Sequence, residues 1–244
     1  MIYVIGLGPG EEQQITPMAI EALEKSEVVA GYTLYIEMIK ELIKDKKTIA
    51  TPMMQEVERC KLIACESKGN KDVAIVSSGD AGIYGMASLM YEVCEELGIN
   101  EEIQVIAGIT AVNSAAAVLG APLSNDFAVI SLSNLLTPWD KIEKRLDLAS
   151  KAGFVIALYN PSSKKRAHFL KMACEIILEN ISENTMCGYV RNIGRKDQGY
   201  KILTLGELKD ESVDMFTTVI IGNAFTKIIN DKLVTPRGYS LEGR

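Results

Sequence analysis

Residues 73–86 read VAIVSSGDAGIYGM. The first four are apolar and mostly β-branched, which predicts a short strand buried on both faces. A small, polar turn follows from Ser77 to Gly82, and apolar residues at helical spacing begin at Ile83. In a parallel sheet, ligands bind at the carboxyl ends of the strands. Because Gly79 and Gly82 carry no side chain, a small molecule can approach the backbone of this turn closely.

The same alternation of strand and helix covers the first half of the chain. We expect strands at residues 1–6, 28–30, 48–50, 73–76 and 103–106, and helices at 17–25, 33–44, 55–67, 83–94 and 111–119. This order predicts a parallel α/β domain over residues 1–120.

The pattern changes after the turn-rich segment Ala121–Asp126. We expect strands at residues 127–132, 153–159, 186–191, 200–205 and 217–222, and helices at 138–151 and 162–180. The last three strands have little helix between them, which favours a mixed or antiparallel sheet. The sequence therefore predicts a second domain, of the α+β class, over residues 121–244.

Composition excludes several classes of protein. The chain has 244 residues, 48% of them hydrophobic, and a net charge of −6. This acidic balance argues against a nucleic-acid partner, and we expect no membrane span and no signal peptide, hence a cytoplasmic protein. The five cysteines form no C-x-x-C pair, and we expect them to be buried thiols. The chain has one histidine, His168, so a histidine metal site or a catalytic triad would depend on that residue alone. We therefore expect no bound metal.

The glycine loop Gly6–Gly10 (GLGPG) raises the alternative of an NAD-dependent oxidoreductase. A dinucleotide site needs a helix that opens directly on the glycines. Here Glu11–Gln14 intervenes, and the helix signal comes only at Thr16 and Pro17. The loop is thus expected to be a tight turn for another ligand.

Six strand-end motifs together carry a resemblance to a known family. They are GLGPG (6–10), SSGDAGIYGM (77–86), AGITA (107–111), YNPSSKKR (159–166), VRNIGR (190–195) and TTVIIGN (217–223). In order and spacing they resemble the tetrapyrrole methylases, two-domain enzymes that use S-adenosylmethionine. YNPSSKKR and VRNIGRKDQ are most similar to the precorrin-3B and cobalt-precorrin-3 C(17)-methyltransferases, which also contract the macrocycle. Ala81 departs from the pattern, because many relatives have proline there.

This resemblance implies a site in a cleft between the two domains, where S-adenosylmethionine is bound and S-adenosylhomocysteine is left. The implied cofactor-binding residues are Pro9, Ser78, Gly79, Asp80, Ile83, Tyr84, Thr110, Ala111, Tyr159, Asn160, Tyr189, Arg191, Asn192, Thr217 and Thr218. The implied substrate is a carboxylate-rich tetrapyrrole, with cobalt present only as part of it. Its candidate contacts are Gly8, Gly10, Lys164, Arg166, Arg191 and Arg195. A homodimer is also implied.

The expected reaction is methylation of C-17 of cobalt-precorrin-3 with ring contraction to cobalt-precorrin-4. A sulfonium methyl is already activated, so the enzyme mainly aligns the reactants and excludes water. Proton transfers in ring contraction could use Asp80, Tyr84, Asp126 or His168, and the sequence does not choose among them. Alternatives are methylation of another carbon such as C-11, the NAD-dependent oxidoreductase, and a non-catalytic nucleotide-binding module.

Overall fold

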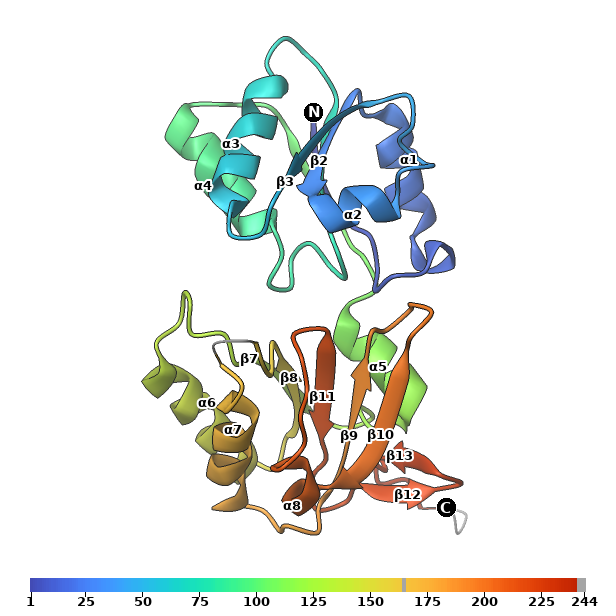
Figure 1. Ribbon diagram of the computed structural model, residues 1–244, viewed down its shortest axis with the longest axis vertical. Coiled ribbons are helices and arrows are strands. Elements are labelled where there is room, and N and C mark those ends of the chain that lie inside the picture. The colour runs from blue at the N-terminus through green and yellow to red at the C-terminus, as the bar shows by residue number, and fades with distance from the viewer. Residues whose placement is uncertain (164–165, 241–244) are drawn as a thin grey trace. The chain divides into compact units, whose positions relative to one another are not determined.

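The computed structural model describes residues 1–163 and 166–240. Internal contacts divide the chain into two compact units, Met1–Ala111 and Val112–Arg244. Each unit has its own five-stranded sheet and its own hydrophobic core (Figure 1).

The sheet of the first unit is entirely parallel, as the sequence predicts. Its strands lie in the order β3-β2-β4-β1-β5. Their bounds are β1 Ile2–Gly6, β2 Val28–Tyr32, β3 Lys47–Thr51, β4 Val73–Ser77 and β5 Ile103–Ile106. The carboxyl ends of β4, β1 and β5 are therefore neighbours, and so are the loops that follow them.

Helices cover both faces of this sheet. Helices α1 (Pro17–Lys25) and α2 (Thr33–Met38) lie on one face, and α3 (Glu56–Glu66) and α4 (Ala87–Leu97) on the other (Figure 1). Alternate residues of β4 enter the two cores, with Ile75 packing toward α3 and α4 and Val76 toward α1 and α2. The predicted burial of β4 on both faces is confirmed.

Two helices of this unit differ from their predicted bounds. Helix α4 begins at Ala87 instead of Ile83, because Tyr84 has a φ of 56° and Gly85 packs against the backbone of Ala81. The segment before α4 is therefore an extension of the ligand loop. Helix α2 ends at Met38, and the turns after it still bury Ile39 and Ile43.

The second unit has a mixed sheet in the order β10-β9-β11-β8-β7. Its strands are β7 Phe127–Ser131, β8 Val155–Tyr159, β9 Met186–Arg191, β10 Gly199–Thr204 and β11 Thr217–Ile221. Strands β7 and β8 are parallel and the other pairs antiparallel, which confirms the predicted mixed sheet. Helices α6 (Trp139–Lys151), α7 (Phe169–Leu178) and α8 (Leu205–Leu208) pack against one face. Helix α7 begins later than the predicted start at Ser162.

Helix α5 (Ala111–Leu119) packs on the other face of the second sheet. A Cβ on Gly188 of β9 would come within 2.8 Å of Leu119 Cδ2, so the helix lies directly on the strand. The contact division falls after Ala111, the first residue of α5, nine residues earlier than the boundary predicted at Gly120. A small sheet of β6 (Gly120–Ala121), β12 (Lys227–Ile229) and β13 (Lys232–Val234), which the sequence analysis did not anticipate, completes this unit.

Candidate active site

Three glycines meet at the carboxyl edge of the first sheet. A Cβ on Gly108 would lie 2.1 Å from the carbonyl oxygen of Gly79, and one on Gly6 would lie 2.7 Å from both Gly79 O and Gly108 N. No side chain fits at Gly6 or Gly108 without moving backbone. The loops after β1, β4 and β5 therefore form one closely packed glycine junction.

Two backbone hydrogen bonds join the first two of these loops. Gly8 N donates to Gly79 O at 3.0 Å, and Gly79 N donates to Gly8 O at 2.7 Å. Both glycines have positive φ angles, 77° and 65°, which L side chains rarely adopt. A Cβ on Gly79 would lie 3.7 Å from Ala111 N, an ordinary van der Waals contact, so glycine is favoured there by its positive φ and not by crowding.

The carboxylate of Asp80 joins the second and third loops. Oδ1 accepts the N–H of Gly82 at 2.8 Å, and Oδ2 accepts the N–H of Gly108 at 3.0 Å. Ionised carboxylates accept such bonds strongly. This geometry makes Asp80 a positioning group for the loops, and a proton-transfer role for it stays a prediction.

The remaining polar and apolar groups of this edge lie around the junction. Ser78 Oγ donates to Tyr35 Oη at 3.1 Å, whereas Ser77 Oγ is buried without a hydrogen-bond partner in the described part of the chain. Ile83 and Tyr84 are exposed. Pro9 and Gly10 are half-buried, and Thr110 and Ala111 lead into α5. All candidates that the sequence assigns to this unit thus lie on one sheet edge.

The structure also bears on the oxidoreductase alternative. The 3₁₀ turn Glu12–Gln14 separates the glycine loop from α1, whose first residue is Pro17 and whose N-cap is Thr16. No helix N-terminus lies at Gly6–Gly10 to hold a pyrophosphate, which argues against a dinucleotide site.

The second sheet gathers its candidates in the same way. Strands β7, β8 and β9 end at one edge, where β11 begins, because β11 is antiparallel to β8 and β9. Tyr159 Oη accepts the N–H of Val112 at 2.7 Å, and Asn160 Nδ2 donates to Ser131 Oγ at 3.0 Å. Asn160 has a φ of 53°. Non-glycine residues in this conformation cluster at ligand sites.

The loop after β9 is held by its neighbours at this edge. Asn192 has a φ of 52°, and its Nδ2 donates to Asp197 at 2.6 Å. Arg191 Nε pairs with Asp214 Oδ2 at 2.7 Å, and the guanidinium of Arg195 lies over the ring of Phe216 at 5.0 Å. Thr217, paired with Arg191 in register, and the following Thr218 are buried.

Tyr189 belongs to the same strand, but its side chain points to the helix-covered face. Its hydroxyl donates to Glu211 Oε2 at 2.9 Å, and its ring packs on the core under the helices. Burial, followed by the bond to Glu211, raises the pKa of Tyr189. Any cofactor contact of this residue would therefore come from its backbone.

Comparison with known proteins identifies the family. The family model described as Tetrapyrrole (Corrin/Porphyrin) Methylases matches residues 1–209. This chain belongs to that family.

Individual relatives place this tetrapyrrole methylase more closely. A Salmonella typhimurium protein named probable cobalt-factor III C(17)-methyltransferase is 44% identical over 241 residues, which covers 99% of this chain and 100% of the relative. The crystal structure of the methyltransferase CobJ has a TM-score of 0.88 and 34% identity, and the match covers 96% of this chain and 99% of that one. A uroporphyrin-III C-methyltransferase from Thermus thermophilus, crystallised with S-adenosylhomocysteine, shares the fold with a TM-score of 0.71, 17% identity and 91% coverage of both chains.

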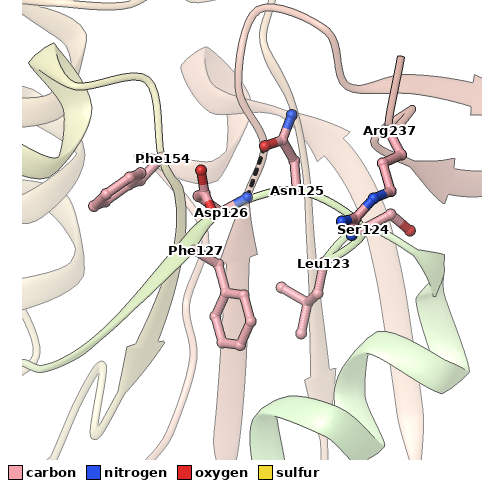
Figure 2. Close-up of a pocket in the computed structure, with 7 residues that line it drawn as sticks. All are labelled: Leu123, Ser124, Asn125, Asp126, Phe127, Phe154 and Arg237. Carbon is pink, nitrogen blue, oxygen red and sulfur yellow. Dashed lines mark hydrogen bonds between the residues drawn. The ribbon is translucent and has the colours of Figure 1, made fainter. Parts of the chain in front are cut away.

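Two catalytic candidates of the methylase lie apart from the gathered residues. Asp126 precedes β7, at the opposite end of that strand from Ser131, and lines a cavity of about 780 Å³ with Phe127, Phe154 and Arg237 (Figure 2). His168 is the exposed N-cap of α7 and meets the ring of Phe169 edge-on at 5.0 Å. The structure therefore places Asp126 at the other end of the sheet from Tyr159 and Asn160. His168 is the last residue of the β8–α7 connection, which begins at Asn160.

The basic candidates of the β8–α7 connection are Lys164 and Arg166. Lys164 lies outside the described residues. Arg166 Nε donates to Ser163 Oγ at 3.1 Å, and its Nη1 is buried without a hydrogen-bond partner among the described residues. A carboxylate oxygen would satisfy this donor.

Sequence reasoning missed several residues that build these edges. Gly6 and Gly108 belong to the motifs GLGPG and AGITA, but neither was singled out as structurally required. Their position at the end of a strand could have indicated this role. Ser131 and Asp214 had no local signal, because each pairs with a residue more than twenty positions away.

Proposed function

We propose that this chain transfers a methyl group from S-adenosylmethionine to C-17 of a cobalt-factor III-type tetrapyrrole, with contraction of the ring. The observation that carries the proposal is the full-length, 44% identical relative whose name states this activity. The residues that this chain gathers at its two sheet edges support it.

The first edge fits the cofactor in its chemistry. Bound S-adenosylmethionine supplies a methyl group already activated by a sulfonium. Ser77 offers a buried hydroxyl without a partner in the described chain, and Ser78 and Asp80 lie half-buried beside it. We assign this edge to the cofactor together with Pro9, Ile83, Tyr84, Thr110 and Ala111. At the second edge, we assign Tyr159, Asn160, Tyr189, Arg191, Asn192, Thr217 and Thr218.

The contribution of these residues to the reaction is positioning. The hydrogen bonds of Asp80 hold the loops together, so little conformational freedom should be lost on binding. Arg166, Arg191 and Arg195 supply guanidinium groups that suit the carboxylates of the substrate. The candidates for the proton donor or acceptor in ring contraction are Asp80, Tyr84, Asp126 and His168.

The test is turnover with defined substrates. The protein is incubated with ¹³C-methyl S-adenosylmethionine and cobalt-factor III, and mass spectrometry and NMR locate the label. One methyl on C-17 supports the proposal. Label on C-11 of a later intermediate, with none gained by cobalt-factor III, would favour the sister methyltransferase. Cofactor binding without turnover on any tetrapyrrole would favour the non-catalytic module.

Assembly and location stay predictions. We expect a homodimer, which light scattering after size-exclusion chromatography tests. In the described part of the chain, no helix has the length and apolar character to cross a bilayer.

A further inference from the structure

Arg59 of α3 is a buried cation that no assigned role explains. Arg59 is only 4% exposed to solvent. Nε donates to Thr51 Oγ1 at 2.8 Å, Nη2 to the carbonyl of Pro52 at 3.1 Å, and Nη1 contacts Met86 Sδ at 3.7 Å. Within the described residues, no carboxylate lies within ion-pair distance of it.

Burial of such a group is costly, because a guanidinium loses its hydration and here gains only neutral acceptors. A leucine or methionine would fill the same space at the end of the core without that cost. What arginine adds is a rigid fork with several donors in fixed directions. The groups that the guanidinium contacts therefore indicate the role of Arg59.

The fork joins two loops of the carboxyl edge. Thr51 and Pro52 open the turn between β3 and α3, and Met86 closes the loop after β4. One guanidinium contacts both, so the turn and the loop are neighbours although they are 34 positions apart from Pro52 to Met86.

Both segments present apolar side chains in strained backbone. Met53 and Met54 are 44% and 74% exposed, and Met54 has a φ of 67°. In the loop after β4, Ile83 is exposed and Tyr84 is 57% exposed with a φ of 56°. Positive φ in such residues persists only where surrounding contacts hold it.

We propose that Arg59 is a positioning residue that holds the Met53–Met54 turn against the loop after β4, so that the turn presents its apolar surface to the flat ring of the tetrapyrrole. This inference rests on the proposed function for the identity of the ring. It adds the β3–α3 turn, which the sequence analysis left out, to the substrate-facing part of the edge.

The experiment compares four variants. Arg59→Met removes the fork, Arg59→Lys keeps the charge with fewer directed bonds, and Met53→Ser/Met54→Ser removes the apolar surface. Lys61→Met is the matched control, because Lys61 lies on the same helix in an outward pair with Glu96. We expect Arg59→Met to raise KM for the tetrapyrrole about tenfold, as the loss of one or two hydrogen bonds would. The double variant should raise KM by a similar factor, because it removes apolar contact with the ring. Arg59→Lys should fall between wild type and Arg59→Met.

A second readout separates positioning from general damage. The Kd of S-adenosylhomocysteine should change by less than about threefold in each variant, since the guanidinium contacts Met86 and not Ile83 or Tyr84, and Asp80 holds the cofactor loop independently of it. Wild-type KM in Arg59→Met and in the double variant overturns the proposal, and so does a loss of S-adenosylhomocysteine affinity that equals the rise in KM.

Failure of the proposed function would look different, because wild-type protein would then not methylate the tetrapyrrole. Amide hydrogen exchange decides the positioning role even in that case. Faster exchange at residues 52–57 and 83–86 in Arg59→Met, and not in Lys61→Met, supports it. Unchanged exchange in both segments overturns it.

Discussion

Asp80 Oδ2 accepts the backbone N–H of Gly108 at 3.0 Å, and this bond ties the loop after β4 to the loop after β5. The other carboxylate oxygen holds Gly82, two residues further along its own loop. Both bonds lie within the first unit. The edge that we assign to S-adenosylmethionine is therefore preorganised by one side chain.

The first prediction concerns this carboxylate. Asp80→Ala removes two charge-assisted hydrogen bonds, each contributing about 1.5–3 kcal/mol. We expect S-adenosylhomocysteine affinity to fall at least about tenfold and methyl transfer to be lost, with the fold retained. Calorimetry and circular dichroism measure both effects. Wild-type affinity and turnover in this variant would show that the assigned pocket is wrong.

The second prediction concerns Gly108. In Gly108→Ala the new methyl group would lie 2.1 Å from Gly79 O, so the glycine junction must open. We expect a loss of about 3 kcal/mol in the free energy of unfolding and no measurable cofactor binding. Gly199→Ala is the control, because a Cβ there meets nothing within 4 Å. Denaturant titration should distinguish the two variants, and equal stabilities would contradict the predicted clash.

The third prediction concerns Arg191. Its ion pair with Asp214 is exposed, so Arg191→Met should change the free energy of unfolding by less than about 1 kcal/mol. If the guanidinium also binds a substrate carboxylate, KM should rise about tenfold with little change in kcat. Lys151→Met, which removes a comparable surface pair with Asp147, should leave KM unchanged. An unaltered KM in Arg191→Met would remove this residue from the substrate site.

The fourth prediction follows from Glu211. Its bond to Lys201, and secondarily its bond to Tyr189, hold the pKa of Glu211 below its ordinary value of 4.5. A lowered carboxyl pKa stabilises the folded state above pH 4.5, and this contribution is lost as the pH falls through the lowered pKa. Glu211→Gln should thus be less stable than wild type at pH 7, and the gap should narrow in acid. Thermal melts from pH 7 to pH 3 test this; a gap independent of pH would contradict it.

The fifth prediction uses the cysteines. Burial raises the pKa of Cys60 and of Cys174 to about 12, and it also raises the pKa of Cys94 and Cys187. Cys65 is exposed. Because thiolates react and buried thiols do not, native protein should take up one N-ethylmaleimide, at Cys65. Cys65→Ser should take up none until it is unfolded, and rapid labelling of Cys174 in native protein would contradict its burial.

Sequence was most informative where a local pattern fixes the structure. The apolar run of β4 required burial on both faces, and Thr16 with Pro17 marked the start of α1. It was wrong where the packing and backbone conformation of a loop decide. Ile83 continues a helical spacing, yet the helix begins only at Ala87, because Gly85 packs against Ala81 and Tyr84 takes a positive φ.

The amino-acid sequence by itself determined the succession of strands and helices along the chain, the parallel first sheet and the mixed second sheet. It also carried the motifs of the tetrapyrrole methylases. These depend on periodicity and on glycines at strand ends, which are local properties. The tertiary structure decided which groups meet: Asp80 with Gly108, Arg191 with Asp214, and Arg59 with both Pro52 and Met86. Apart from Arg59 and Pro52, these pairs join residues more than twenty positions apart, and only packing of the sheets and helices sets their distances.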